Sequence, residues 1–405
     1  MFTNMLQCSL LQTTKKWKSG GMKGHIQKRG ANSWRIKVDT GRDPLTGKRA
    51  TTYVTVRGTK KYAQRELARM IHEVETGHFV ELSKMALSEY LEHWIEDYAQ
   101  TAVSRSTFER YSELLRLHVI PHLSAVPLSK LKPLHIQKLY GGLLTNGRRD
   151  GTGGLAPQTV KHVHRVLHQA LQHAVRWQMI SLNPAASVDP PKVERRQIDV
   201  LSNEEARELV EASRGTRLYA PIVLALNSGL RRGEILGLRW QDLDFEGRQL
   251  SVTQSVEQTS AGLRLKEPKT KRSRRSITLP DVAIETLRKH KIQQSQNRLR
   301  LGRDYQDNDL VFPQLDGNLQ NPRVFSKDFK RLATRIGLDH VTLHGLRHTH
   351  LTMLLRANVH PKIASERAGH SSVAITLDIY SHAVPNMQED AARVMDELFK
   401  NAEGE

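Results

Sequence analysis

One short stretch, Thr342–His348, constrains this chain most, because it joins a helix start to two side chains that bind anions. Thr342 directly precedes a run with helical apolar spacing, which predicts a helix with this threonine as its N-cap. His344 and Arg347 are three residues apart and therefore share one face of the first turn. The unpaired N–H groups and the dipole of a helix start also favour an anion. The stretch predicts a phosphate site, although a capped surface helix could carry the same His-x-x-Arg pattern.

Four further motifs accompany this stretch. Upstream lie a Gly-Leu-Arg segment that ends in Gly-Glu, at Ser228–Glu234, and a basic segment at Pro268–Arg275. Downstream lie a Gly-His pair within Ala368–Ser372 and a tyrosine within Asp378–His382. Five partly independent motifs in one order over about 150 residues rarely coincide by chance. Their order of arginine, lysine, His-x-x-Arg, Gly-His and tyrosine resembles that of the tyrosine recombinases, also called phage integrases.

The resemblance implies that the protein cuts and rejoins DNA through a 3′-phosphotyrosine intermediate and a Holliday junction. The implied catalytic residues are Arg231, Lys269, His344, Arg347, His370 and Tyr380. A phosphodiester resists attack because its anionic oxygens repel nucleophiles, and its transition state gathers still more negative charge. A guanidinium offers two donors to one phosphate and keeps its proton, which suits the two arginines to this charge.

The resemblance also gives each remaining side chain a role. Tyr380 is the implied nucleophile, and its phenol, with an ordinary pKa near 10, needs a proton acceptor, for which His344 is the candidate. Lys269 is the candidate acid for the departing 5′ oxygen, with Lys271 as the alternative two residues later. His370 would donate to a non-bridging phosphate oxygen.

Two neighbours of Arg231 have subsidiary implied roles. Glu234 would orient an active-site partner or cap its helix, and Arg232 would serve the surface or the DNA backbone. We expect no metal and no ATP, because cationic side chains supply the charge and the phosphotyrosine keeps the bond energy for the second transfer. The implied partners are double-stranded DNA with core-type and arm-type attachment sites, three further copies of the chain in a homotetramer, and an accessory DNA-bending or excision factor.

The composition favours a DNA-binding protein. The 405 residues include 62 Lys and Arg against 42 Asp and Glu, a formal net charge of +20, and nucleic acid is the usual partner of such a chain. The single cysteine, Cys8, excludes an internal disulfide framework and is typical of a reducing cytosol. No apolar run approaches about 18 residues, so we expect no transmembrane helix and a cytoplasmic, nucleoid-associated location in a bacterial host.

The N-terminal part predicts a small DNA-binding domain. After an expected tail at residues 1–20, apolar and basic residues alternate from Trp34 to Asp39 and again from Thr52 to Arg57, which is strand periodicity, and a helix is expected from Lys60 to Gly77. Residues 21–78 resemble the arm-binding domain of some integrases, whose three-stranded sheet enters a major groove. The expected DNA contacts are Arg35, Lys37 and Arg57; a merely solvated basic face is the alternative.

Residues 82–188 predict a unit of four helices, because four stretches carry apolar residues at helical spacing. By resemblance this is the core-binding domain, with Lys161 and Arg165 meeting phosphates. His164 and His168 lie four residues apart in its last helix, but without further ligands we expect no metal site there. Residues 189–199, rich in proline and basic residues, predict a linker.

Residues 200–385 predict a mostly helical catalytic domain with a small antiparallel sheet. Strands are expected at Leu250–Val256 and Ile277–Leu279, with Lys269–Arg275 as a basic hairpin tip. Lys271 and Arg274 are the candidate DNA contacts there. Residues 386–405 predict an amphipathic helix and tail that packs either on its own domain or, as in the family, on a neighbouring subunit.

The sequence therefore predicts a multidomain, mainly α protein: a three-stranded sheet with one helix, a four-helix domain, and a mostly helical catalytic domain. The predicted function is that of a site-specific recombinase from a phage or integrative element. Two alternatives are a type IB topoisomerase-like enzyme with the same chemistry and a non-catalytic regulator on an integrase scaffold. The arm-like module and C-terminal tail favour recombination, and the full set of six side chains favours an active enzyme. A metal-dependent nuclease is disfavoured, since no carboxylates stand at ligand spacing.

Overall fold

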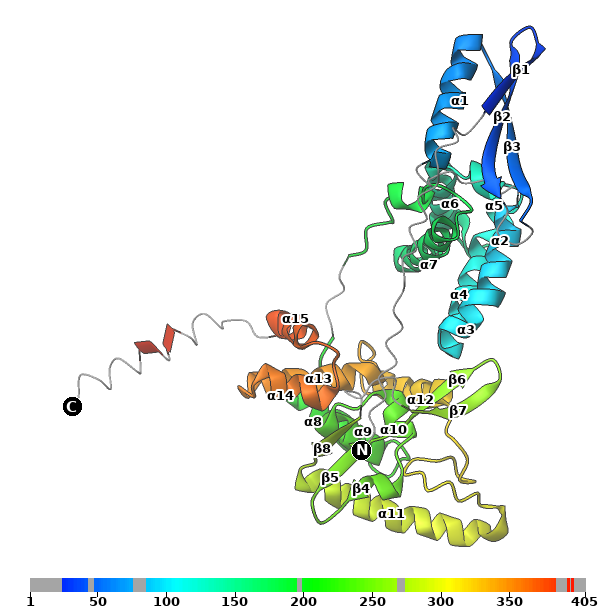
Figure 1. The fold of residues 1–405 in the computed structure, drawn as a ribbon. Coiled ribbons are helices and arrows are strands. Elements are labelled where there is room, and N and C mark those ends of the chain that lie inside the picture. The colour runs from blue at the N-terminus through cyan, green and yellow to red at the C-terminus, as the bar shows by residue number, and fades with distance from the viewer. Residues whose placement is uncertain are drawn as a thin grey trace, which may run out of the picture. The chain divides into compact units, whose positions relative to one another are not determined.

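The computed structural model describes most of the chain, namely residues 24–42, 47–75, 85–194, 199–267, 274–383, 392–393 and 395–396. The chain divides into two compact units, which we describe separately (Figure 1). The first comprises the described residues up to Ala102 together with Tyr111–Val193, and the second comprises Val103–Arg110 and those from Glu194 onward. Within the described ranges, no helix is both long enough and apolar enough to span a membrane.

An antiparallel sheet opens the first unit. Its strands β1 (Gly24–Gly30), β2 (Ser33–Arg42) and β3 (Arg49–Arg57) pair in chain order, and helix α1 (Lys60–Glu75) packs against them. Ile36 and Val38 are fully buried and form a small core with Met70 of α1. On the opposite face, the Arg35 guanidinium lies 4.4 Å from the ring centroid of Tyr53. The predicted sheet with one basic face is confirmed.

The remainder of the first unit is helical, as predicted. Its main elements are a continuous helical run made of α2 (Leu87–His93), a π-helical turn (Trp94–Ala99) and α3 (Gln100–Ala102), then α4 (Arg105–His118), α6 (Pro133–Asn146) and α7 (Pro157–Arg176). Short pieces at α5 (Ile120–Leu123), Leu128–Lys130 and Pro184–Ser187 connect them. Trp94 is fully buried and donates to His173 Nδ1 at 2.9 Å. His164 Nδ1 lies 2.9 Å from the Tyr140 hydroxyl, so this histidine completes a buried polar pair.

The second unit is built around α9 (Tyr219–Ser228), a helix whose residues are mostly buried. The other helices are α8 (Asn203–Ser213), α10 (Arg232–Leu236), α11 (Asp281–Leu301), α12 (Pro322–Arg335), α13 (Leu343–Arg356), α14 (Pro361–Ala368) and α15 (Val373–Ala383). Single 3₁₀ turns lie at Trp240–Asp242 and Gly302–Asp304. Helix α13 packs on both α9 and α14 (Figure 1). The first turns of α10 and α13 and the end of α14 supply the candidate site described below.

Two small sheets complete the second unit, and they differ from the prediction. β4 (Leu243–Asp244), β5 (Gln249–Val252) and β8 (Arg275–Thr278) form one antiparallel sheet in the order β4-β5-β8, while β6 (Ser255–Thr259) pairs with β7 (Gly262–Lys266). The single strand expected at residues 250–256 is wrong, because it breaks at Thr253 and Gln254. The Thr253 hydroxyl donates to Asp242 and the Gln254 amide donates to the Gly237 carbonyl, so both side chains bond to a neighbouring loop.

The expected hairpin tip also needs correction. β7 pairs with β6 and β8 pairs with β5, so the segment between them connects two sheets and does not close one hairpin. Arg275 belongs to β8 and its side chain is only 6% exposed, so it does not belong to a tip. Residues 268–273, with Lys269 and Lys271, lie outside the described part of the chain.

Candidate active site

The N-terminus of α13 faces a cavity of about 540 Å³. Thr342 is the N-cap, as predicted, because its hydroxyl accepts from the Gly345 N–H at 3.0 Å. The exposed His344 lines the cavity together with Arg231 of the α10 N-terminus, 113 positions earlier in the chain. The fold thus joins two of the predicted catalytic residues at one opening, beside the positive end of a helix.

Arg347 follows His344 by three residues in α13 and is almost completely buried, with 2% of the residue exposed. Its Nη1 donates to the Gly229 carbonyl at 2.7 Å, whereas its Nη2 has no hydrogen-bond partner among the described residues. Burial, followed by the nearby charge of Arg231, lowers the pKa of Arg347 to about 9, so it stays protonated at neutral pH. An unpaired buried donor is costly, more so when it is charged, and an anion bound next to it would remove this cost.

Two glycines hold the two arginines. Gly229 ends α9 and Gly369 ends α14, both in the left-handed region with φ of 66° and 64°. The carbonyl of Gly229 accepts from Arg347, and the carbonyl of Gly369 accepts from Arg231 Nη2 at 2.8 Å. The C-terminal caps of two helices therefore aim carbonyl oxygens at the guanidinium groups, and a neutral acceptor leaves the arginine charge uncancelled.

Glu234 fills both of the roles proposed from the sequence. Its Oε2 accepts from the Arg231 backbone N–H at 2.8 Å and caps α10, while its Oε1 accepts from Arg231 Nη1 at 2.9 Å. Burial alone would raise the pKa of this carboxyl, but the hydrogen bond and charge of Arg275, with a smaller effect from Arg231, hold the pKa below its ordinary value. Glu234 is thus an ionised carboxylate that orients Arg231. Arg232, by contrast, is exposed and donates to Ser326 Oγ at 2.8 Å.

His370 follows Gly369 and reaches toward α15. Its Nδ1 lies 2.8 Å from the hydroxyl of Thr376, which is fully buried in that helix. Tyr380 belongs to the same helix, one turn after Thr376, but its side chain is outside the described part of the structure. The fold therefore brings Arg231, Arg347 and the Gly369–His370 segment together, while Lys269 is not described.

The imidazoles around Arg347 are neutral at pH 7. Burial, followed by the charge of Arg347, lowers the pKa of His344, and burial with neighbouring charges lowers the pKa of His348 and of His370 to about 4 each. The rings of His344 and His348 meet edge to face with centroids 4.8 Å apart. Within the described residues His348 Nδ1 has no hydrogen-bond partner. Neutral histidines can accept a proton, and they do not add to the repulsion between the arginines.

The sequence analysis did not predict that the guanidinium of Arg275 binds the carboxylate of Glu234. The signal was present in the strand itself. Side chains two residues apart point to the same face of a strand, and Ile277 is apolar and 1% exposed. Arg275, two positions before Ile277, is therefore expected to point inward, while its neighbour Arg274 points outward and pairs with Glu267 at 2.7 Å.

The candidate DNA contacts lie on several elements. Lys37 and Arg57 are exposed on the sheet beside the half-buried Arg35. Arg165 is exposed on α7, where Lys161 is half-buried, and Arg274 is exposed directly before β8. Lys271 lies outside the described residues. Their roles stay predictions.

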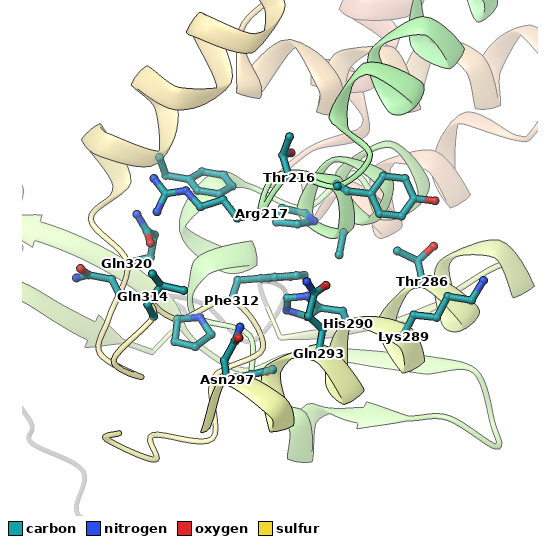
Figure 2. A pocket seen from close by; sticks show the side chains of 18 of the residues that line it. Thr216, Arg217, Thr286, Lys289, His290, Gln293, Asn297, Phe312, Gln314 and Gln320 are labelled. Atoms are coloured by element: carbon teal, nitrogen blue, oxygen red, sulfur yellow. The ribbon is translucent and has the colours of Figure 1, made fainter. Parts of the chain in front are cut away.

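A second cavity of about 270 Å³ lies between the start of α9, helix α11 and the loop before α12 (Figure 2). Amide and aromatic side chains line it, including His290, Phe312 and Gln320, and none of the four candidate catalytic side chains that the structure describes is among its lining residues. Gln320 is only 5% exposed. The chemistry predicted from the motifs does not map to this cavity.

Comparison with known proteins decides the family. Residues 199–387 match the phage integrase family, and residues 86–144 match the N-terminal SAM-like domain of phage integrases. A tyrosine recombinase XerC-like protein of Caldanaerobacter subterraneus subsp. tengcongensis is 30% identical over 399 residues, which cover 93% of this chain and 99% of that protein. This chain belongs to the phage integrase family. The recombinase is also 24% identical to the ICEBs1 integrase of Bacillus subtilis, over 92% of this chain and all of that one.

Solved structures show the same fold. The Tn1549 transposon integrase, in complex with a circular intermediate DNA, aligns with a TM-score of 0.63 at 21% identity, over 78% of the recombinase and 99% of that chain. A lambda integrase dimer bound to a core site aligns with a TM-score of 0.53 at 18% identity, over 87% and 93%. The predicted fold class, enzyme class and function, site-specific recombination by a mobile element, are confirmed, and neither alternative function finds support.

Proposed function

We propose that the recombinase cleaves DNA by attack of Tyr380 on a phosphodiester held by Arg231, Arg347 and the N-terminus of α13. The observation that carries this proposal is the buried, unpaired Nη2 of Arg347, on the same helical turn as His344, which lines a cavity together with Arg231. Donors fixed before the reaction stabilise the charge that develops on the phosphate oxygens, and a dry site strengthens each of these contacts.

The proton movements follow from the chemistry of the remaining groups. The Tyr380 oxygen forms a bond to phosphorus as the bond from phosphorus to the 5′ oxygen breaks. His344, neutral because burial lowers its pKa, takes the phenolic proton, and Lys269, with Lys271 as the alternative, gives one to the departing oxygen. If the Thr376 hydroxyl donates to His370 Nδ1, then the Nε2 of His370 carries the hydrogen and donates to the phosphate. Reversal with a new 5′ hydroxyl rejoins the strands, so the cycle needs neither a metal ion nor ATP.

We further propose the division of labour expected from the sequence. Residues 21–78 bind arm-type sites through Arg35, Lys37 and Arg57; residues 82–188 bind core-type sites through Lys161 and Arg165; residues 200–385 carry the chemistry, with Lys271 and Arg274 on the DNA. The linker at 189–199 joins the last two domains, and residues 1–20 stay outside them. The half-buried Arg35 guanidinium and the exposed Lys37 ammonium, which both lie next to the Tyr53 ring, support the first assignment.

The assembly we propose is a homotetramer that holds two duplexes in a Holliday junction. A lambda integrase tetramer bound to a Holliday junction shares the fold at 18% identity with a TM-score of 0.54. In this assembly residues 386–405 pack on a neighbouring subunit, an accessory bending or excision factor assists one direction of the reaction, and the complex acts on DNA in the bacterial cytoplasm.

The test traps the covalent intermediate. A nicked suicide duplex that carries the element's own end releases a short 5′ fragment on cleavage, so that rejoining fails and an SDS-stable adduct at a 3′ phosphate accumulates. Tyr380→Phe should bind this duplex with wild-type affinity and form no adduct, since it lacks only the nucleophilic oxygen. Tyr219→Phe, which removes the hydroxyl of a tyrosine at the second cavity, is the matched control and should form the adduct normally. Adduct formation by Tyr380→Phe would refute the assignment of the nucleophile.

A further inference from the structure

Arg275 differs from the other basic residues of its segment in being buried. Its side chain is 6% exposed, whereas that of Arg274 is 62% exposed and pairs with Glu267 on the surface. A buried guanidinium needs partners for its donors, because removing it from water is costly. These partners show what the side chain does.

The Arg275 guanidinium makes a two-pronged contact with Glu234. Its Nη2 lies 2.8 Å from Oε2 and its Nη1 lies 3.1 Å from Oε1, while its Nε donates to the Arg367 carbonyl at 2.7 Å. This paired geometry fixes the plane of the carboxylate as well as its position, which a lysine ammonium could not do. β8 is thereby tied both to the first turn of α10 and to the last turn of α14.

Both groups that hold Arg231 are in contact with Arg275. Glu234 accepts from Arg231 through the same two oxygens that accept from Arg275. Gly369, whose carbonyl accepts from Arg231, lies so close to Arg275 that an added Cβ would approach Nη1 to 2.9 Å. Arg275 therefore supports Arg231 from two sides, through a carboxylate and through a backbone segment.

Charge balance gives this contact a consequence for the reaction. With Arg275 in place, one carboxylate is shared by two guanidinium groups, and a net positive charge remains at the Arg231 end. Without Arg275, Glu234 would be balanced by Arg231 alone. Its attraction would then draw Arg231 inward and cancel much of the field that a phosphate experiences.

We infer that Arg275 is a positioning residue for strand cleavage, which fixes Arg231 through Glu234 and the Gly369 backbone and leaves the charge of Arg231 to the phosphate. The inference rests on the proposed function, because it assigns Arg275 a part in the same reaction. Arg275 is not one of the six catalytic residues that the resemblance implies, and it does not line the cavity that Arg231 and His344 share.

The test compares single-turnover cleavage of the suicide duplex by the full-length chain with duplex affinity and thermal unfolding. Arg275→Gln leaves Glu234 buried with one partner fewer and could unfold the protein, so Arg275→Lys, which keeps the charge but loses the fork, is the main variant. We expect Arg275→Lys to cleave about 10- to 100-fold more slowly with its duplex affinity within about threefold of wild type, because small misplacements of a catalytic group are that costly. Arg214→Gln removes an exposed arginine paired with Glu211 and is the control expected to cleave at the wild-type rate.

A double variant separates positioning from general structural support. If Arg275 acts through Arg231, then Arg275→Lys should slow an Arg231→Gln background by less than about threefold, because residues that act as a unit are not additive. If the cleavage-rate losses of the two single variants multiply in the double variant, or if Arg275→Lys cleaves at the wild-type rate, the inference is overturned. Neither result would contradict the proposed function. A wild-type chain that forms no adduct would overturn both.

Discussion

Gly229 offers the sharpest test of how the fold builds this site. It sits at the C-terminal end of α9 with φ of 66°, and its carbonyl accepts from Arg347 Nη1 at 2.7 Å. A Cβ added to Gly229 would approach His350 Cδ2 to 2.6 Å, a separation at which one of the two groups must move. Gly229→Ala therefore perturbs both the backbone conformation and the packing directly beside an active-site arginine.

The cost of this substitution has two parts. Holding alanine in the left-handed region costs about 1–2 kcal/mol, and forcing a methyl group into a packed interior costs about 1–3 kcal/mol. Gly337 provides a matched control, since its φ is 76° and no described atom lies within 4 Å of an added Cβ. Gly337→Ala should therefore show only the first cost, and the difference between the two variants isolates the contact with His350.

Calorimetry and cleavage together measure the outcome. At about 2–4 °C per kcal/mol for a unit of this size, Gly337→Ala should lower the unfolding temperature of the unit that contains α9 by about 2–8 °C. Gly229→Ala should lower it by several degrees more. Because the displaced carbonyl would release Arg347, Gly229→Ala should also cleave the suicide duplex about 100-fold more slowly, whereas Gly337→Ala should cleave normally. Equal unfolding temperatures, or normal cleavage by Gly229→Ala, would refute the reasoning.

Two further predictions concern buried polar groups. Burial lowers the pKa of His350 to about 4, and its Nδ1 lies 2.7 Å from the Leu226 carbonyl. The folded pKa lies below the unfolded value of about 6.5, so between these two values the unfolded chain binds the proton and the folded chain does not. The free energy of unfolding is therefore unaffected by this group above pH 6.5 and decreases as the pH falls from 6.5 toward 4. Between pH 7 and pH 4.5 the unfolding free energy of His350→Asn should therefore fall by about 2–3 kcal/mol less than that of the wild type. An equal fall in the two proteins would contradict this. Thr352 is 1% exposed and its hydroxyl has no hydrogen-bond partner among the described residues, so Thr352→Val should raise the unfolding free energy by about 1 kcal/mol; a destabilised variant in denaturant titrations would contradict this.

Local sequence signals predicted the fold where one residue type determines one backbone conformation. The N-cap predicted at Thr342 is present, with its hydroxyl accepting from the Gly345 N–H at 3.0 Å. The alternation around Ile36 placed its side chain correctly in the core of the N-terminal sheet. These features depend on interactions within a few residues, which a single sequence contains in full.

The features that were missed depend on distant partners. Helix α11 has 21 residues, but only its first turns are buried, and large apolar residues such as Ile292 and Leu299 are exposed, so no regular apolar stripe marks it. β5 and the start of β6 were merged into one predicted strand because the break between them depends on hydrogen bonds from Thr253 and Gln254 to another loop. Arg275 was predicted to belong to a basic hairpin tip because it is charged and follows other basic residues, although its position two residues before Ile277 indicates an inward-pointing side chain.

Both arginines of the site donate to a backbone carbonyl, but only Arg231 also donates to a carboxylate, and this difference has a physical reason. Arg347 is buried and donates to a backbone carbonyl, so its whole charge remains for a ligand, and its unpaired Nη2 is a costly donor that a bound anion would satisfy. Arg231 has a side chain that is 41% exposed and would sample several rotamers if it were held only by a carbonyl, so a carboxylate fixes it. A carboxylate beside a phosphate site would repel the ligand unless a further cation neutralised it. Arg275 supplies that cation from inside the fold, so that rigidity at Arg231 is obtained without loss of positive charge at the phosphate.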